Sequence, residues 1–209
     1  NMDIKKTANL FANFTIKRLS EIFGLSIFFI GLLLLLALLT YSPEDPNFIF
    51  PDNTEIKNIL GFNGSFISDL FFQSIGMISY LICLTLIVTG INIFRVKDFF
   101  LIIENIFFAI IYSIFGTLFL SHFYSDAFTL YINGNGGFVG SYFNQTFLNS
   151  LILVNNVVFY YVLIFLIFVF FLISINFRPI KFYINLKKFF TIFGKTEIKN
   201  YTHKNEIIN

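Results

Sequence analysis

Residues 32–48, LLLLLALLTYSPEDPNF, join an unbroken apolar run to an abrupt polar stop. The apolar run starts at Ile22 and reaches Tyr41 without a charged residue. A helix of about 20 residues spans the roughly 30 Å of a bilayer's hydrocarbon core. Helices buried in soluble proteins rarely stay apolar on every face over this length. The stretch therefore predicts a first transmembrane helix over 22–41, which ends where Pro43 and the two following acidic residues meet water.

The composition of the whole chain supports a membrane protein. Of its 209 residues, 56% are hydrophobic and 12% are charged, whereas about 25% of the residues of a typical soluble domain are charged. The single cysteine, Cys83, excludes a disulfide within the chain, and no Cys or His spacing typical of a zinc site occurs. We therefore expect no catalytic, cofactor or metal site in this chain.

Three further apolar segments predict transmembrane helices at about 70–94, 99–122 and 154–175. The last one follows an uncharged, Gly- and Asn-rich stretch, NGNGGFVGSYFNQ (133–145). This stretch predicts a loop with an interfacial or re-entrant piece. Its G-x-x-x-G spacing favours a tight turn, with a close helix contact as the alternative. The expected fold class is an all-α integral membrane domain of four transmembrane helices.

The basic residues indicate the orientation of these helices, because Lys and Arg concentrate on the cytoplasmic side of membranes. Of the 14 Lys and Arg, only Lys57 falls between the first and second helices, where acidic residues dominate. Both ends of the chain are therefore expected in the cytoplasm. The residues assigned to the cytoplasmic side are Lys5, Lys6, Lys17, Arg18, Arg95, Lys97, Arg178, Lys181, Lys187, Lys188, Lys195, Lys199 and Lys204.

The expected organisation has three parts. Residues 1–21 form an amphipathic cytoplasmic lead-in, which we expect along the inner leaflet before the chain turns into the bilayer. Residues 22–177 form the four-helix membrane domain. Residues 178–209 form a basic cytoplasmic tail, whose charge favours anionic lipid as its partner, with duplex DNA as the alternative.

Two acidic residues near the expected spans have structural and functional interpretations. Glu104 lies about two helical turns after Lys97, so we expect it to reach the cytoplasmic interface or to pair with Arg95 or Lys97. A proton or ion relay is the alternative, because a carboxylate inside a span is often functional. Asp69 stands at the start of the expected second helix and is interpreted as its N-terminal cap.

A partial phosphate-binding motif occurs near the end of the tail, at Gly194, Lys195 and Thr196. A complete motif needs another glycine five residues before Gly194, because glycine-rich backbone wraps the phosphates. That position holds Phe189. Without a complete Walker A motif, the chain is not expected to be an enzyme by itself.

Several short motifs recur in order around the expected spans. LLTYSPEDP (38–46) ends the first, NILGFNGSFISDL (58–70) enters the second, and GGFVG (136–140) precedes the fourth. Together they resemble the N-terminal four-helix membrane domain of FtsK/SpoIIIE-type DNA translocases. Ser65 and Ser68 depart from that pattern, since alanine is usual there. The residues that carry the resemblance are Tyr41, Ser42, Pro43, Asp45, Pro46, Gly61, Gly64, Asp69, Gly76, Gly136, Gly137 and Gly140.

The resemblance implies a membrane anchor that places a DNA translocase at the division septum of the bacterial inner membrane, for cell division and chromosome segregation. It implies six copies side by side and contacts with other division proteins. ATP, Mg and DNA would be bound by a motor domain that is not in this chain, and residues 178–209 would start the linker to it.

If six copies crowd together, small residues on the spans are candidate packing points between them. A stand-alone tetraspan division scaffold without a motor is an alternative function. A small transporter or channel is a further alternative, for which Glu104 would be the starting point. The candidate packing points are Gly24, Gly31, Gly76, Gly90 and Gly116.

Overall fold

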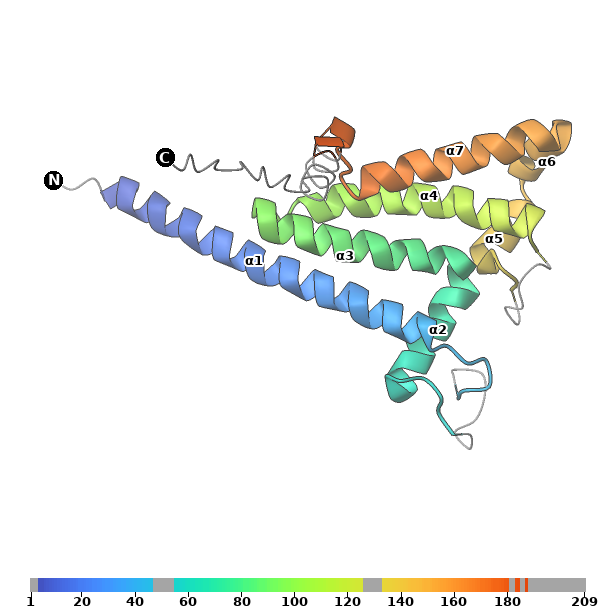
Figure 1. Cartoon of the computed structure of the whole chain (residues 1–209), viewed down its shortest axis with the longest axis horizontal. Helices are drawn as coiled ribbons and strands as arrows, with labels where there is room; N and C mark the ends of the chain where they lie inside the picture. Colours follow the sequence, from blue (N-terminus) through green and yellow to red (C-terminus); the bar gives the residue numbers. More distant parts are fainter. Residues whose placement is uncertain (1–3, 47–54, 126–132, 181–182, 185–186, 188–209) are drawn as a thin grey trace, which may run out of the picture. The chain divides into compact units, whose positions relative to one another are not determined.

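The computed structural model describes residues 4–46, 55–125, 133–180, 183–184 and 187, and the regular elements among them are helices. The chain divides into two units, residues 1–176 and 177–209. All of the named helices belong to the first unit and are drawn in Figure 1. They are α1 (Ile4–Leu39), α2 (Gly61–Ile75), the 3-10 turn η1 (Gly76–Ile78), α3 (Ser79–Val96), α4 (Leu101–Phe123), α5 (Gly137–Asn144), α6 (Phe147–Val154) and α7 (Asn156–Ser174).

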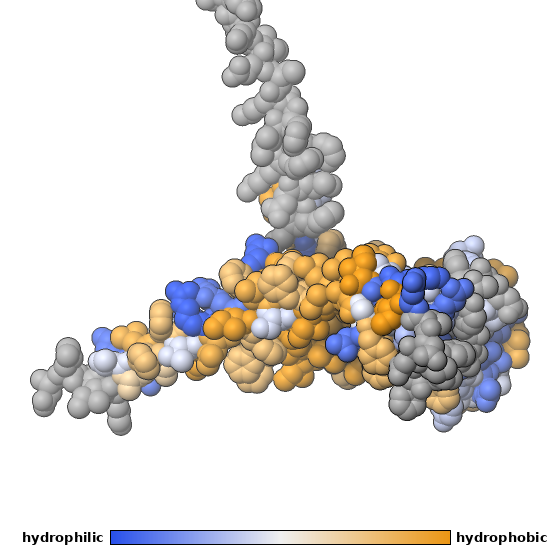
Figure 2. Space-filling view, turned by 90° about the horizontal axis from the view of Figure 1, so that it is seen from below, coloured by the Kyte–Doolittle hydropathy of each residue, from blue (hydrophilic) through white to orange (hydrophobic). Residues whose placement is uncertain are grey.

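Four helical segments are long and apolar enough to cross a membrane, and this confirms the predicted all-α fold with four spans. Many of their large apolar side chains are exposed, so that the surface over the helices is largely hydrophobic in Figure 2. Such a surface is stable in lipid and would be unstable in water. The four segments are Lys6–Leu39, Gly61–Val96, Leu101–Phe123 and Asn156–Ser174.

The first helix is longer than the predicted span. α1 runs without a break from Ile4 to Leu39, so the described part of the lead-in continues the helix and does not turn along the leaflet as expected. The physical reason is that no proline precedes Pro43 and that Gly24 is packed against α3. With 36 residues, α1 is about 54 Å long, which exceeds the roughly 30 Å hydrocarbon core.

The second span is bent and starts earlier than predicted. It begins at Gly61 as α2, passes through η1 and continues as α3 to Val96. At the bend, Gly76 has a φ of +61°. A Cβ added to Gly76 would overlap the carbonyl of Asn135. Both the backbone conformation and the close approach therefore require glycine at this position.

The spans pack as two neighbouring pairs, with α1 along α3 and α4 along α7 (Figure 1). A buried cluster that includes Leu38, Phe72 and Cys83 joins α1, α2 and α3. A second cluster, which includes Leu118 and Leu163, joins α4 to α7. The short helix α5 packs against both α2 and α4, and so it connects the two pairs.

The glycines expected to pack between copies are used within one chain. Gly24, Gly31, Gly76, Gly90 and Gly116 are all buried, and a Cβ added to any of them would clash with a neighbouring element of the same chain. Gly24 and Gly90 face each other where α1 crosses α3, which lets the two backbones approach closely. In the described structure these five glycines therefore pack within one chain, and their role as contact points between copies stays a prediction.

The Gly- and Asn-rich stretch forms a turn followed by α5. Gly136 and Gly140 lie against Thr117 and Ser121 of α4, and a Cβ at either glycine would overlap the Thr117 carbonyl. The close helix contact, which was the alternative interpretation, is thus present at these two glycines, directly after the turn. α6 then precedes α7, so that the last span begins at Asn156.

Of residues 177–209 the structure describes 177–180, 183–184 and 187, among which Arg178 and Ile180 are exposed. Most of the lysines of the basic tail lie outside the described residues. The partial phosphate-binding motif at Gly194–Thr196 and the residue Phe189 also lie outside them.

Candidate functional site

The family-motif residues at the end of α1 belong to a group of hydrogen-bonded side chains that we call the outer clasp. It closes the loop between α1 and α2, around residues 47–54, which lie outside the described residues. The distribution of Lys and Arg predicts that this end of the helices faces away from the cytoplasm. The outer clasp consists of Tyr41, Asp45, Pro46, Asn58, Ser65 and Asp69.

Asp45 is the centre of the outer clasp. Its side chain is fully buried, and its two carboxylate oxygens accept hydrogen bonds from the backbone N–H groups of Lys57 and Asn58, each at 2.8 Å. Hydrogen bonds to a charged acceptor are stronger than those between neutral groups. The carboxylate thus holds together the two ends of the loop. This contact is the structural reason for an Asp at this position of the SPEDP motif.

Asn58 connects the loop to the end of α1. Its side-chain amide donates to the carbonyl of Ala37 (2.9 Å), one of the last carbonyls of α1, which have no partner within the helix. Its side-chain oxygen accepts from the N–H of Leu60 (3.1 Å). A Cβ at Gly64 would overlap this side chain. Asn58 was not among the predicted site residues, although it begins the NILGFNGSFISDL motif that contains Gly64.

Tyr41 and Asp69 join the end of α1 to the middle of α2. The Tyr41 hydroxyl donates to Oδ1 of Asp69 (3.1 Å), and the Tyr41 ring lies against Phe72 with a centroid distance of 4.8 Å. Asp69 is buried and lies well inside α2, which begins at Gly61. The interpretation of Asp69 as a helix cap is therefore wrong, because the helix starts two turns earlier than its apolar pattern indicates.

The pair Glu44–Lys57 lies beside the outer clasp at the surface. Lys57 Nζ is 2.5 Å from Glu44 Oε2, and both side chains are largely exposed. The hydrogen-bonded Lys57 ammonium lowers the pKa of Glu44, and the Glu44 carboxylate raises the pKa of Lys57. This pairing gives the one basic residue of the outer loop a local partner. Its exposure limits what the pair adds to stability.

A second group of motif residues meets at the bend of the second span, and we call it the bend junction: Gly76, Met77, Asn133, Asn135, Gly136 and Gly137. The N–H of Met77 donates to the Asn135 carbonyl (3.0 Å), and the Asn133 amide donates to the Gln73 carbonyl (3.2 Å). The buried Asn135 side chain donates to the carbonyl of Tyr124. The bend junction therefore joins the bent span to the turn before α5 and to the end of α4.

The structure thus divides the motif residues between these two places. Ser42 accepts a backbone hydrogen bond from Asp45 within the turn that leads into the outer clasp. Asn135 was missed as a site residue, and its position directly before the motif glycines Gly136 and Gly137 was the available signal. The residues at or beside the outer clasp are Tyr41, Ser42, Pro43, Asp45, Pro46, Gly61, Gly64 and Asp69, and those at or beside the bend junction are Gly76, Gly136, Gly137 and Gly140.

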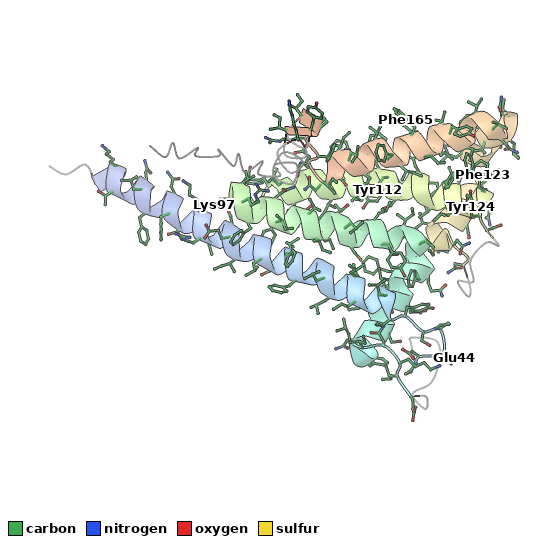
Figure 3. All side chains as sticks on the ribbon, viewed as in Figure 1. Glu44, Lys97, Tyr112, Phe123, Tyr124 and Phe165 are labelled. Carbon is green, nitrogen blue, oxygen red and sulfur yellow. The ribbon has the colours of Figure 1, made fainter. Side chains whose placement is uncertain are left out.

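Glu104 lies in the first turn of α4 and is exposed. Its expected partner Lys97 instead contacts Glu21 of α1 at 2.7 Å, and Glu21 also holds Arg18 at 2.6 Å. Among the described residues Glu104 makes no ion pair, so its predicted pairing with Arg95 or Lys97 is wrong. Lys97 and Glu44 lie toward opposite ends of the helical body (Figure 3).

The arrangement of both groups is structural. Asp45 and Asp69 accept hydrogen bonds that hold the fold together. Within the described ranges, no three His, Cys, Asp or Glu side chains come together as metal ligands. What the outer clasp and the bend junction can do is fix the spans relative to one another through polar groups at the outer end of the helices.

Comparisons with known proteins give one family. Residues 16–187 match the family model described as the 4TM region of DNA translocase FtsK/SpoIIIE. The DNA translocase FtsK of Rickettsia prowazekii (strain Madrid E) is 31% identical over 167 residues, which cover 78% of this chain and 21% of that protein. This chain therefore spans only a small part of the length of this relative. No solved structure matches the chain.

Proposed function

The chain belongs to the family of 4TM regions of FtsK/SpoIIIE DNA translocases, and from this membership we propose that it is a membrane anchor that places a DNA translocase at the bacterial division septum. The observation that carries the proposal is the extent of the family match, which runs from residue 16 through the end of the last span. In this function the chain works by placement, in support of cell division and chromosome segregation.

The charge distribution of the helical body supports the membrane orientation that such an anchor requires. Lys97 and Glu44 lie toward opposite ends of the helical body (Figure 3). Lys97 contacts Glu21, which also holds Arg18, and Glu44 pairs with Lys57. By the positive-inside rule the end with Lys97 is cytoplasmic. The chain after α7 then leaves the membrane on the side where DNA and a motor are found.

The proposed partners follow from the same function. The bilayer surrounds the spans, and the basic tail favours anionic lipid. Further copies of the chain, six in the family's arrangement, and other division proteins are proposed partners of the assembled anchor. ATP, Mg and DNA would be bound by a motor domain outside this chain.

The placement can be tested with a fluorescent protein fused after Asn209 and expressed in dividing bacteria. We expect fluorescence in the membrane that gathers in a band at mid-cell before constriction. An even membrane signal in dividing cells would contradict septal placement, and a cytosolic signal would contradict the anchor itself. A single-span membrane anchor joined to the same fluorescent protein is the control, because it reports the extra membrane present at any septum.

The reading frame after the Asn209 codon separates the anchor from a motor-free scaffold. A frame that continues through a linker into a complete G-x-x-x-x-G-K-[ST] motif would support the anchor. A stop codon at that point would favour the stand-alone scaffold. Within the described residues, Glu104 makes no contact that would support a transporter or channel.

A further inference from the structure

A network of buried and partly buried polar side chains ties the C-terminal end of α7 to α3 and α4. The Asn105 amide of α4 donates to Thr89 Oγ1 of α3 (2.8 Å) and to Oδ1 of Asn176 (2.9 Å), which follows α7. From α3, the amide of Asn92 donates to the carbonyl of Ile175 (3.1 Å). Two different helices thus hold the two residues that directly follow the last span.

The network continues one turn deeper into the membrane. Thr85 Oγ1 of α3 lies 2.9 Å from the Tyr112 hydroxyl of α4 and 3.2 Å from Ser174 Oγ of α7. Asn105, Tyr112 and Ser174 are fully buried. Figure 3 places Tyr112 between the helices, away from both ends. We call the whole set the exit joint: Thr85, Thr89, Asn92, Asn105, Tyr112, Ser174 and Asn176.

Away from this joint, α7 is held mainly by side-chain packing against α4. Of its 19 residues, only Leu163 and Ser174 are buried, and Phe165 projects on the side away from α4 (Figure 3). Lipid tails are as apolar as these side chains, so the hydrophobic effect does not hold α7 against α4 inside a bilayer. Polar bonds with fixed partners resist sliding of α7 along its axis, because a shift of one residue separates their atoms.

The exit joint lies where the chain leaves the membrane domain. α7 ends at Ser174, Asn176 has a left-handed backbone with a φ of +51°, and the chain continues directly into residue 177. Asn176 is the last residue of the first unit, so tension on the tail passes along the chain into this residue. The bonded partners at that point belong to α3 and α4, which pack on other parts of the domain.

We propose that the exit joint transfers tension from the tail to α3 and α4, so that the last span is not drawn out of the domain alone. The proposal rests on the anchor function for the source of the tension, which is the reaction to a motor pulling on DNA. In this mechanism Asn105 is a positioning residue, because it bonds both to α3 and to the residue that receives the tension. Asn92 provides an independent second tie.

The test is to pull the full chain in lipid bicelles with magnetic tweezers, using handles at its two ends. We expect the last span to leave first at constant force. In Asn105→Leu, which removes both amide bonds and keeps a similar volume, we expect this step to be about tenfold faster. The matched control is Tyr124→Phe, which removes the 2.7 Å hydroxyl contact with Tyr160 at the other end of the same helix pair. We expect its extraction rate from the tail to be unchanged.

Equal extraction rates for wild type and Asn105→Leu, or equal acceleration by Asn105→Leu and Tyr124→Phe, would overturn the proposal. If Asn105→Leu does not refold between pulls, Asn92→Leu tests the independent tie in the same way, with the same expected direction. The experiment contains no motor and no septum. If the pulling experiment contradicts the exit joint, the proposed anchor function is unaffected. If the fluorescent fusion does not reach the septum, the measured effect of the exit joint is unaffected.

Discussion

At the scale of single residues, two neighbouring carboxylates have different roles. Asp45 is fully buried and accepts two backbone hydrogen bonds, whereas Glu44 is exposed and pairs with the flexible end of Lys57. A buried carboxylate without donors would be very costly, so these two N–H groups are a condition for its presence. The difference explains why Asp45, and not Glu44, belongs to the motif.

We therefore expect Asp45→Asn to lower the free energy of unfolding by about 1–3 kcal/mol, because the amide supplies one acceptor oxygen for two N–H donors, of which that of Asn58 is buried. Reversible unfolding in mixed micelles measures this change. Glu44→Gln is the matched control, with little expected effect, since its side chain is in water. A similar loss in both variants would show that burial of Asp45 does not decide its importance.

The Glu44–Lys57 pair predicts a pH dependence of its own. The pKa of Glu44 is lowered, so its contribution to stability is present above its ordinary pKa and is lost as the pH falls through the lowered value. The pKa of Lys57 is raised, so its contribution is present below its ordinary pKa and is lost as the pH rises through the raised value. NMR titration of the Glu44 carboxyl checks the acid side. We expect Lys57→Gln to move its midpoint upward, and an unmoved midpoint would contradict the pairing.

At the scale of helices, hydropathy and charge predicted four spans and their order but not their bends. Residues 61–69 contain Asn63, Ser65 and Ser68, so they look like a loop, yet these serines are buried by tertiary contacts and the segment is helical. Gly76 lies in an apolar run, and transmembrane helices tolerate glycine without a bend at that position, so the sequence alone does not predict the bend. Its bend depends on Asn135, which is distant in sequence, and no local pattern reports such a contact.

The candidate site could be predicted only in part, because its contacts also join residues that are distant in sequence. The motif spacing selected Tyr41, Asp45 and Gly64, but it did not indicate which groups they contact. Asn58 and Asn135 act through long-range hydrogen bonds to backbone atoms. Asparagine is common in this chain's loops, so only the three-dimensional contacts distinguish these two from the others.

The crossing of α1 and α3 gives a prediction at this scale. A Cβ at Gly90 would overlap backbone atoms of Phe28 and Gly24, so we expect Gly90→Leu to lower the free energy of unfolding by about 1–3 kcal/mol or more. Leu33→Ala, on the exposed side of α1, is the control with a smaller expected loss. The measurement is again unfolding in mixed micelles. Normal stability combined with weaker cross-linking between copies would instead place Gly90 at an interface between chains.

At the scale of the whole molecule, the polar groups gather at the two ends of the spans. The outer clasp and the bend junction fix the outer end, while the Glu21–Lys97 contact and the exit joint fix the cytoplasmic end. Between them the helices pack mainly through apolar side chains and close glycine contacts, together with the buried Thr85–Tyr112 contact. This division suits an anchor, because both surfaces keep a defined shape while lipid covers the middle.

This arrangement requires that the two ends face different compartments, which single cysteines can test in intact spheroplasts. Glu55 lies in the loop after α1 and Asp98 in the turn between α3 and α4, and both are exposed. A membrane-impermeant maleimide should label Glu55→Cys in intact spheroplasts and Asp98→Cys only after the membrane is opened, because the basic end faces the cytoplasm. Native Cys83 is fully buried, so the unmodified chain should stay unlabelled and serves as the control. Labelling of Asp98→Cys in intact spheroplasts would reverse the orientation, and with it the side on which a motor could meet DNA.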